Sequence, residues 1–158
     1  MATNRKEIIV ALAKYLDKGQ FEARVIHIAI LQKHYLELVL LGQKTIESRL
    51  SKRKIAPYQK VAEGDCILFK ESGGEILAMA EVKQCWYYQN PDIDWCKRKF
   101  NSLVCGADNY WESKRDAKYA SFILISGLHQ FPQPIKISKK DGRGWVVFTP
   151  DSDVLGYS

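Results

Sequence analysis

Hydrophobic residues along the chain follow two periods, one typical of helices and one typical of strands. In residues 3–18 they recur at helical spacing, and Asn4 followed by Glu7 is typical of a capping box. Residues 24–31 are rich in β-branched side chains, which favours a strand. These criteria predict helices over residues 3–18, 32–41, 92–105 and 110–119, and strands over residues 24–31, 44–49, 66–70, 75–84, 120–126, 135–139 and 145–148.

Glycines indicate where these elements end and turn. Gly19 and Gly42 follow the first two helical segments, in positions typical of a helix C-cap. Ser72-Gly-Gly74 predicts a hairpin between the third and fourth strands, because glycine accepts a positive φ. Asp141-Gly-Arg-Gly144 predicts a second hairpin between the last two strands.

The order of these elements predicts an α+β protein, a small β-barrel of short twisted strands with helices on one side. A doubly wound parallel sheet is disfavoured, because that fold needs repeated strand–helix units and usually a glycine-rich phosphate turn. Neither G-x-G-x-x-G nor a P-loop motif occurs in the sequence. With 158 residues and no internal repeat or linker, the chain is expected to form one domain.

Composition and charge narrow the class of protein. Hydrophobic residues make up 46% of the chain and charged residues 27%, so it can bury a core. The net charge of +6 favours polyanionic partners such as RNA, DNA or nucleotides. The four cysteines include no C-x-x-C pair, which disfavours a structural zinc site. The sequence lacks a secretory signal and a membrane span, so we expect a cytoplasmic monomer with reduced thiols and no membrane partner.

The densest cluster of polar chemistry is the segment Lys44-Thr-Ile-Glu-Ser-Arg49. In a strand, its period of two places Ile46 on one face and Thr45, Glu47 and Arg49 on the other. Lys44 is suited to holding a phosphate or polarising a carbonyl, Glu47 to accepting protons, and Arg49 to binding a phosphate or carboxylate. The alternative is that Glu47 and Arg49 form only a surface ion pair. A basic loop with Lys52, Arg53 and Lys54 follows, and its charge argues against burial.

Aromatic and basic residues alternate later in the chain. Trp86 and Tyr87 belong to an aromatic run, and Trp95 and Trp111 have lysines and arginines nearby. Single-stranded nucleic acid binds by stacking bases on such rings beside cations that contact phosphates. Each ring taken singly is better explained as a core anchor.

Residues 25–150 resemble the ASCH (activating signal cointegrator homology) family, which has a PUA-like fold. The resemblance rests on Leu41-Gly-Gln-Lys-Thr-Ile-Glu-Ser-Arg49, on Val61-Ala-Glu-Gly-Asp-Cys-Ile-Leu-Phe69, and on the hairpin that follows. It implies a small PUA-like β-barrel with a cleft between barrel and flanking helices, lined by residues 44–49. The chain then divides into an added N-terminal helix (1–20), an ASCH/PUA-like domain (21–150) and a C-terminal tail (151–158).

The resemblance also implies candidate functions. Family members resemble RNA-binding or nucleotide-recognising modules, and some resemble ribonucleases assisted by a divalent metal. One bacterial branch resembles amidohydrolases acting on N4-acetylcytidine, with a catalytic lysine in a Lys-Thr-x-Thr string. Lys44 matches that lysine, but Glu47 replaces the second threonine, which disfavours deacylation.

Three hypotheses follow. The first is a module that binds single-stranded RNA or a modified nucleobase in a basic cleft, with Glu47 at a base amino edge and Trp86 or Tyr87 stacking. Its remaining predicted contacts are Lys44, Arg49, Lys52, Arg53 and Lys54. The second is a hydrolase using Lys44, Thr45 and Glu47, for which a divalent metal is expected only if it is a ribonuclease. The third is a protein-interaction module in transcription or translation, using the N-terminal helix.

Overall fold

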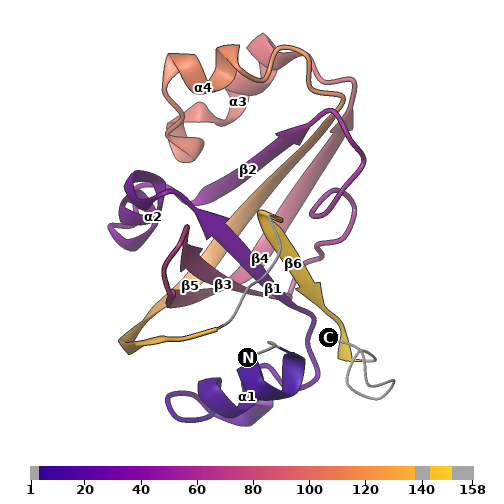
Figure 1. Ribbon diagram of the computed structural model, residues 1–158. Helices are drawn as coiled ribbons and strands as arrows, with labels where there is room; N and C mark the ends of the chain where they lie inside the picture. Colours follow the sequence, from indigo (N-terminus) through magenta and orange to yellow (C-terminus); the bar gives the residue numbers. More distant parts are fainter. Residues whose placement is uncertain (1–3, 138–142, 151–158) are drawn as a thin grey trace.

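The computed structural model describes residues 4–137 and 143–150 (Figure 1). Its described strands form one six-stranded sheet in the order β2-β5-β4-β3-β1-β6. The strands are β1 (Ile26–Leu31), β2 (Ile46–Ser51), β3 (Cys66–Glu71), β4 (Ile76–Gln89), β5 (Tyr119–Ile135) and β6 (Trp145–Phe148). The helices are α1 (Arg5–Leu12), α2 (Lys33–Leu40), α3 (Ile93–Val104) and α4 (Asp108–Glu112), with a short 3-10 helix at Lys18–Gln20.

The sheet is curled into an open half-barrel. β1 runs parallel to β3, and all other neighbouring strands are antiparallel. The longest strands, β4 and β5, pair through several register shifts, and such bulges bend a strand and increase its twist. The predicted α+β fold with a barrel-like sheet is therefore confirmed, with β2 and β6 as the free edges of the curl.

Local sequence signals explain most element ends. The Asn4 side chain accepts a hydrogen bond from the Glu7 amide at 2.9 Å, as the capping box predicts. Gly42 has φ +77° after α2, in the left-handed region expected of a helix end. α1 ends at Leu12, earlier than predicted, and the amides of Lys14 and Tyr15 bond three residues back in the turn that follows. Asp17 then caps the short 3-10 helix.

The predicted helix over residues 110–119 is wrong in extent, because α4 ends at Glu112. The Ser113 hydroxyl donates to the carbonyl oxygen of Tyr110, and the Lys114 amide bonds three residues back to Trp111. Serine side chains compete in this way with the helical hydrogen-bond pattern. The chain therefore makes a turn here, and this turn brings Lys114 to the pocket described below.

The predicted final hairpin is also wrong. β6 pairs antiparallel with β1, with Trp145 opposite Ala29, whereas Ile135 at the end of β5 pairs with Ile76. A period of two identifies a strand but does not identify its partner. Part of the predicted hairpin, residues 138–142, and the predicted tail, residues 151–158, lie outside the described residues.

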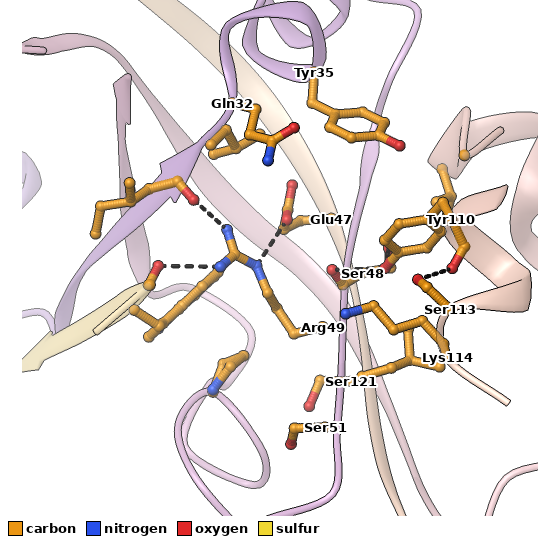
Figure 2. A pocket seen from close by; sticks show the side chains of 18 of the residues that line it. Gln32, Tyr35, Glu47, Ser48, Arg49, Ser51, Tyr110, Ser113, Lys114 and Ser121 are labelled. Carbon is orange, nitrogen blue, oxygen red and sulfur yellow. Dashed lines mark hydrogen bonds and ion pairs between the residues drawn. The ribbon is translucent and has the colours of Figure 1, made fainter. Parts of the chain in front are cut away.

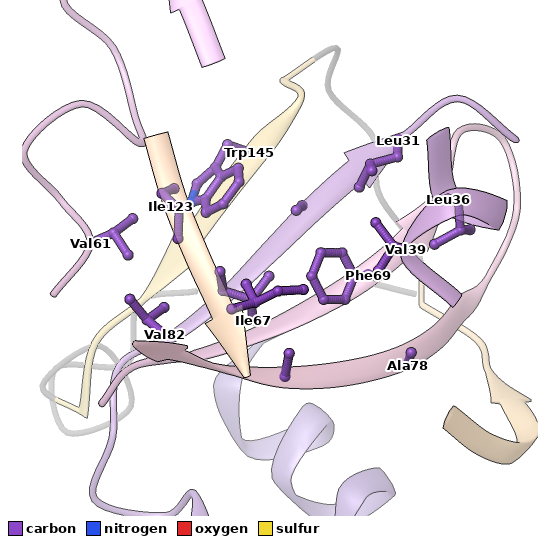
Figure 3. Close-up of a cluster of buried hydrophobic side chains, with 13 residues drawn as sticks. Leu31, Leu36, Val39, Val61, Ile67, Phe69, Ala78, Val82, Ile123 and Trp145 are labelled. Atoms are coloured by element: carbon purple, nitrogen blue, oxygen red, sulfur yellow. The ribbon is translucent and has the colours of Figure 1, made fainter. Parts of the chain in front are cut away.

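Three hydrophobic clusters stabilise the fold. One lies inside the curl and includes Trp145, with Leu36 and Val39 contributed by α2 (Figure 3). A second lies between the sheet and α1, and a third between the sheet and the α3–α4 pair. The helices are thus not on one side as predicted, because α1 and the α3–α4 pair cover opposite ends of the sheet (Figure 1).

The N-terminal helix is an integral part of the second cluster. Ile8, Ile9 and Leu12 are buried in it, and the Arg5 guanidinium donates to the carbonyl oxygens of Glu22 and Arg24. Val10, by contrast, is 66% exposed. This arrangement favours a packing role for α1 over a docking role, because its apolar face is already covered. Within the described residues, no helix combines the length and apolarity needed to cross a membrane.

Leu12→Ala should lower the free energy of unfolding by about 2–5 kcal/mol, because truncating a fully buried leucine loses apolar contacts and leaves a cavity. Urea denaturation measures this change. Val10→Ala, on the exposed face of the same helix, is the control and should change stability by less than about 0.5 kcal/mol. Equal effects of the two variants would contradict the packing role of α1.

Candidate functional site

A pocket of about 620 Å³ opens between the β2 edge of the sheet, α2, α4 and the chain segment that leads into β6. Figure 2 shows its polar side chains converging from these separate elements. β2 contributes Glu47 and Arg49 from one strand face, and Ser48, Leu50 and Ser51 also line the pocket, so alternation alone does not determine the lining. Lys44, just before the strand, also lines the pocket.

Lys44 is buried in this pocket, with 3% of its surface exposed. Its ammonium donates to the carbonyl oxygens of Ile46 and Val104, each at 2.9 Å, and lies 3.8 Å from Oε2 of Glu47. Burial is the largest influence on its pKa and lowers it, while the Glu47 carboxylate partly opposes this effect.

Arg49 bridges the two edges of the curled sheet. Its Nε donates to Oε1 of Glu47 at 2.9 Å, and its terminal nitrogens donate to the carbonyl oxygens of Ile30 and Gly144 at 2.9 and 3.1 Å. The guanidinium carbon also lies 5.2 Å from the ring centre of Trp145. The Glu47 side chain is only 6% exposed, so this is a buried network and not the surface ion pair that the sequence left open.

Glu47 carries an acceptor without a hydrogen bond. Within the described residues, its Oε2 is buried and no donor lies at hydrogen-bond distance, although the Lys44 ammonium is 3.8 Å away. An unsatisfied buried carboxylate oxygen costs free energy that a donor group would recover. Figure 2 shows the carboxylate pointing toward Gln32 and Tyr35, which line the same pocket.

Trp145 is held in place by a buried chain of hydrogen bonds. Its indole Nε1 donates to Nδ1 of His27 at 3.0 Å, and Nε2 of His27 donates to the Asp65 carboxylate at 2.8 Å. His27 is therefore a hydrogen-bonded core residue, as predicted from its place in an apolar strand. Sequence reasoning did not identify Trp145 as a pocket residue, because its contact with Arg49 depends on the closure of the curl.

Serine hydroxyls, Tyr110 and Lys114 line the α4 side of the pocket. The Tyr110 hydroxyl and the Ser48 hydroxyl are 2.7 Å apart, and burial raises the pKa of Tyr110, so it remains protonated. Burial, followed by repulsion from Arg49, lowers the pKa of Lys114. Figure 2 shows the Lys114 ammonium pointing into the pocket toward Ser48, Arg49 and Ser121.

The structure brings only some of the predicted site residues together. Lys44, Glu47 and Arg49 line the pocket, whereas Thr45 does not. Lys52, Arg53 and Lys54 are exposed and lie in the chain between the lining residues Ser51 and Ile55, so they form its rim. Lys52 is paired there with Asp116 at 2.7 Å.

Trp86 and Tyr87 do not line this pocket, although the Tyr87 ring packs edge-on against the lining residue Tyr58 at 5.6 Å. Trp86 packs against Phe100 of α3, and the Tyr87 hydroxyl donates to the carbonyl oxygen of Val61 at 2.6 Å. Their predicted stacking role does not fit this placement. The tyrosine and tryptophan rings that do line the pocket come from separate segments: Tyr35, Tyr58, Tyr110, Tyr119 and Trp145.

The donor set does not fit a divalent metal. The described part of the chain contains no group of three or more His, Cys, Asp or Glu side chains placed to hold an ion, and Glu47 is the one carboxylate lining the pocket. Its near oxygen already accepts from Arg49, and cations surround it. We therefore derive no chemical step through a metal.

The fold and the pocket together define a class: an α+β half-barrel with a polar cleft where the sheet edges approach. The sequence model of the ASCH domain matches residues 30–126, more than half of the chain, so the chain belongs to the ASCH domain family. No curated protein matches the chain.

Two crystal structures from Zymomonas mobilis are similar in fold. A serine-to-alanine variant of its ASCH protein is 11% identical, with a TM-score of 0.65, covering 85% of this chain and 96% of the other. The ASCH protein itself is 10% identical, with a TM-score of 0.63, covering 83% and 94%. At such identities the likeness shows the fold alone.

Raising the pH should stabilise the protein relative to its Lys44→Met variant. The pKa of Lys44 is lowered in the folded state, whereas in the unfolded chain it is about 10.4. Between these two values the unfolded state holds more protons on this side chain, so the free energy of unfolding rises with pH. Urea denaturation from about pH 7 to about pH 10 measures the difference. Lys83 is exposed, so the difference in free energy of unfolding between the protein and Lys83→Met should not change with pH. A difference that also stays constant with pH for Lys44→Met would contradict the burial of the charged Lys44 side chain.

Proposed function

We propose that this protein recognises single-stranded RNA by binding one nucleotide base in the pocket. The observation that carries the proposal is the Glu47 carboxylate, whose buried oxygen lacks a hydrogen-bond donor in the described structure. A base amino group, as in cytosine or adenine, donates to a carboxylate in the way this oxygen requires. The other Glu47 oxygen is held by Arg49, so the acceptor is fixed in direction.

The walls of the pocket suit a flat aromatic ligand. Tyr35 and Tyr110 lie near one another, with ring centres 6.1 Å apart. The Arg49 guanidinium lies over the face of the Trp145 ring. Recognition of unpaired RNA bases commonly combines such rings with hydrogen bonds to a base edge. The pocket volume of about 620 Å³ is in the range of small-molecule sites, so it can accept a nucleotide.

The rim supplies contacts for the flanking backbone. Arg53 and Lys54 are exposed beside the pocket, and no ion pair engages either side chain within the described residues. Phosphate contacts of this kind supply affinity without base preference. The rim cations therefore bind the backbone of the RNA, and Glu47 selects the base.

Glu47→Gln should reduce the preference for cytidine and adenosine oligoribonucleotides over uridine oligoribonucleotides. Glutamine preserves the side-chain shape and an acceptor for Arg49, but it removes the carboxylate charge and one acceptor oxygen. The preference should fall by about fivefold to a hundredfold, the loss expected for one base-specific contact. Fluorescence anisotropy with labelled single-stranded oligonucleotides measures it. Glu63→Gln, exposed and outside the pocket, should retain the preference, and retention by both variants would overturn the role of Glu47.

Removing the rim charges should weaken the binding of all RNA sequences by the same factor. In Arg53→Gln/Lys54→Gln, the slope of log affinity against log salt concentration should fall by roughly 0.7 for each lost phosphate contact. Titrations of the same oligonucleotides at several salt concentrations measure the slope. The matched control is Lys14→Gln/Lys83→Gln, which removes equal charge from exposed positions outside the pocket. An unchanged slope in the rim variant would exclude these contacts.

Hydrolysis is the second candidate function for this pocket. The burial of Lys44 in the pocket favours it, because burial lowers the pKa of the ammonium and so increases the fraction of neutral amine, the form that accepts a proton. Thr45, however, does not reach the pocket, and Lys44 is engaged by two carbonyl oxygens. We expect binding without product during long incubation. Product that is lost in Lys44→Met but formed by Lys83→Met would make catalysis the function instead.

A further inference from the structure

The pocket has a carboxylate at one end only. There the single negative charge of Glu47 partly offsets Lys44 and Arg49, and protein oxygens accept their hydrogen bonds. At the α4 end, the ammonium of Lys114 makes no hydrogen bond or ion pair with any residue that the structure describes. Asp116, which attracts it, is paired instead with Lys52 at 2.7 Å.

Lys114 and Lys99 both contact aromatic rings, and of these two cations only Lys114 lines the pocket. Lys97 is paired with Asp108, and Arg115 with Asp94 and Glu112. Lys114 is half-buried over the Tyr110 ring at 5.6 Å, and repulsion from Arg49 contributes to its lowered pKa. Two neighbouring cations that share a cavity without a carboxylate between them favour an anion there.

A free hydroxyl lies on the wall that both cations face. Ser121 is directly opposite Arg49 in the register of β2 and β5, and it lines the pocket. Its hydroxyl has no hydrogen-bond partner among the described residues, whereas those of Ser48, Ser51 and Ser113 are already engaged. Ser121 can therefore donate to a ligand oxygen without breaking a bond within the protein.

We propose that Lys114, Ser121 and the outer side of Arg49 form a phosphate subsite, so that the pocket takes a nucleotide and not a free nucleoside. The inference rests on the proposed function for the base end, and it adds a charge requirement at the other end. Along β2, Glu47 and Arg49 are two residues apart, about 7 Å, so Glu47 and Ser121 are separated along the sheet. A nucleoside monophosphate presents its base edge and its phosphate at opposite ends in the same way.

Calorimetry with cytidine, adenosine and their 5′- and 3′-monophosphates tests the proposal. A monophosphate should bind about tenfold to a hundredfold more tightly than its nucleoside, the gain typical of a charge-assisted hydrogen bond. In Lys114→Met, which keeps the packing on Tyr110, this gain should shrink to less than about threefold while nucleoside affinity is unchanged. Ser121→Ala should lose part of the gain, and Lys83→Met none of it. Equal affinity for nucleoside and monophosphate in the unaltered protein, or equal weakening of both in Lys114→Met, would overturn the subsite.

A second measurement separates this inference from base recognition. Acylation of lysines by an N-hydroxysuccinimide ester, read by mass spectrometry, should be slowed at Lys114 by millimolar inorganic phosphate but not at Lys83. If no nucleoside or nucleotide binds, base recognition fails, while protection by phosphate alone still supports the subsite. If neither phosphate nor any monophosphate protects Lys114, the subsite is excluded even where nucleosides bind.

Discussion

The Arg49 guanidinium is the interaction on which the rest of the site depends. It spans from β2 to the carbonyl oxygens of Ile30 and Gly144, so one side chain links the two ends of the curled sheet where backbone hydrogen bonds do not. Glu47 orients it from the same strand. Because a side chain, and not a ladder of backbone hydrogen bonds, connects the two edges, a cavity remains between them.

The support for this bridge extends into the core. Trp145 packs against the guanidinium, and His27 and Asp65 hold the indole from behind. A buried chain of hydrogen bonds such as Trp145–His27–Asp65 is rigid and favours one arrangement of its side chains. The site is thus built on strands and on a buried hydrogen-bond chain, which suits recognition of a ligand by shape and by direction of hydrogen bonding.

Charge is distributed unevenly within this rigid frame. The Lys44, Glu47 and Arg49 group is largely satisfied by the protein, except for one carboxylate oxygen, whereas Lys114 contacts the Tyr110 ring but no carboxylate among the described residues. The pocket therefore lacks a donor at one end and an anion at the other. The Zymomonas mobilis structures share the fold at 10–11% identity, and a fold shared at that level does not transfer a ligand.

The sequence by itself determined the α+β class, most strands and helices, and the clustering of Lys44, Glu47 and Arg49, because these depend on local periodicity and spacing. It did not determine which strands pair, so the expected final hairpin was wrong and β6 joined β1 instead. It also could not separate Trp86 and Tyr87, which pack elsewhere, from Tyr35, Tyr110 and Trp145, which line the pocket. Only the closure of the sheet decided that, because closure brings residues distant in the chain, such as Arg49, Lys114 and Trp145, into one cavity.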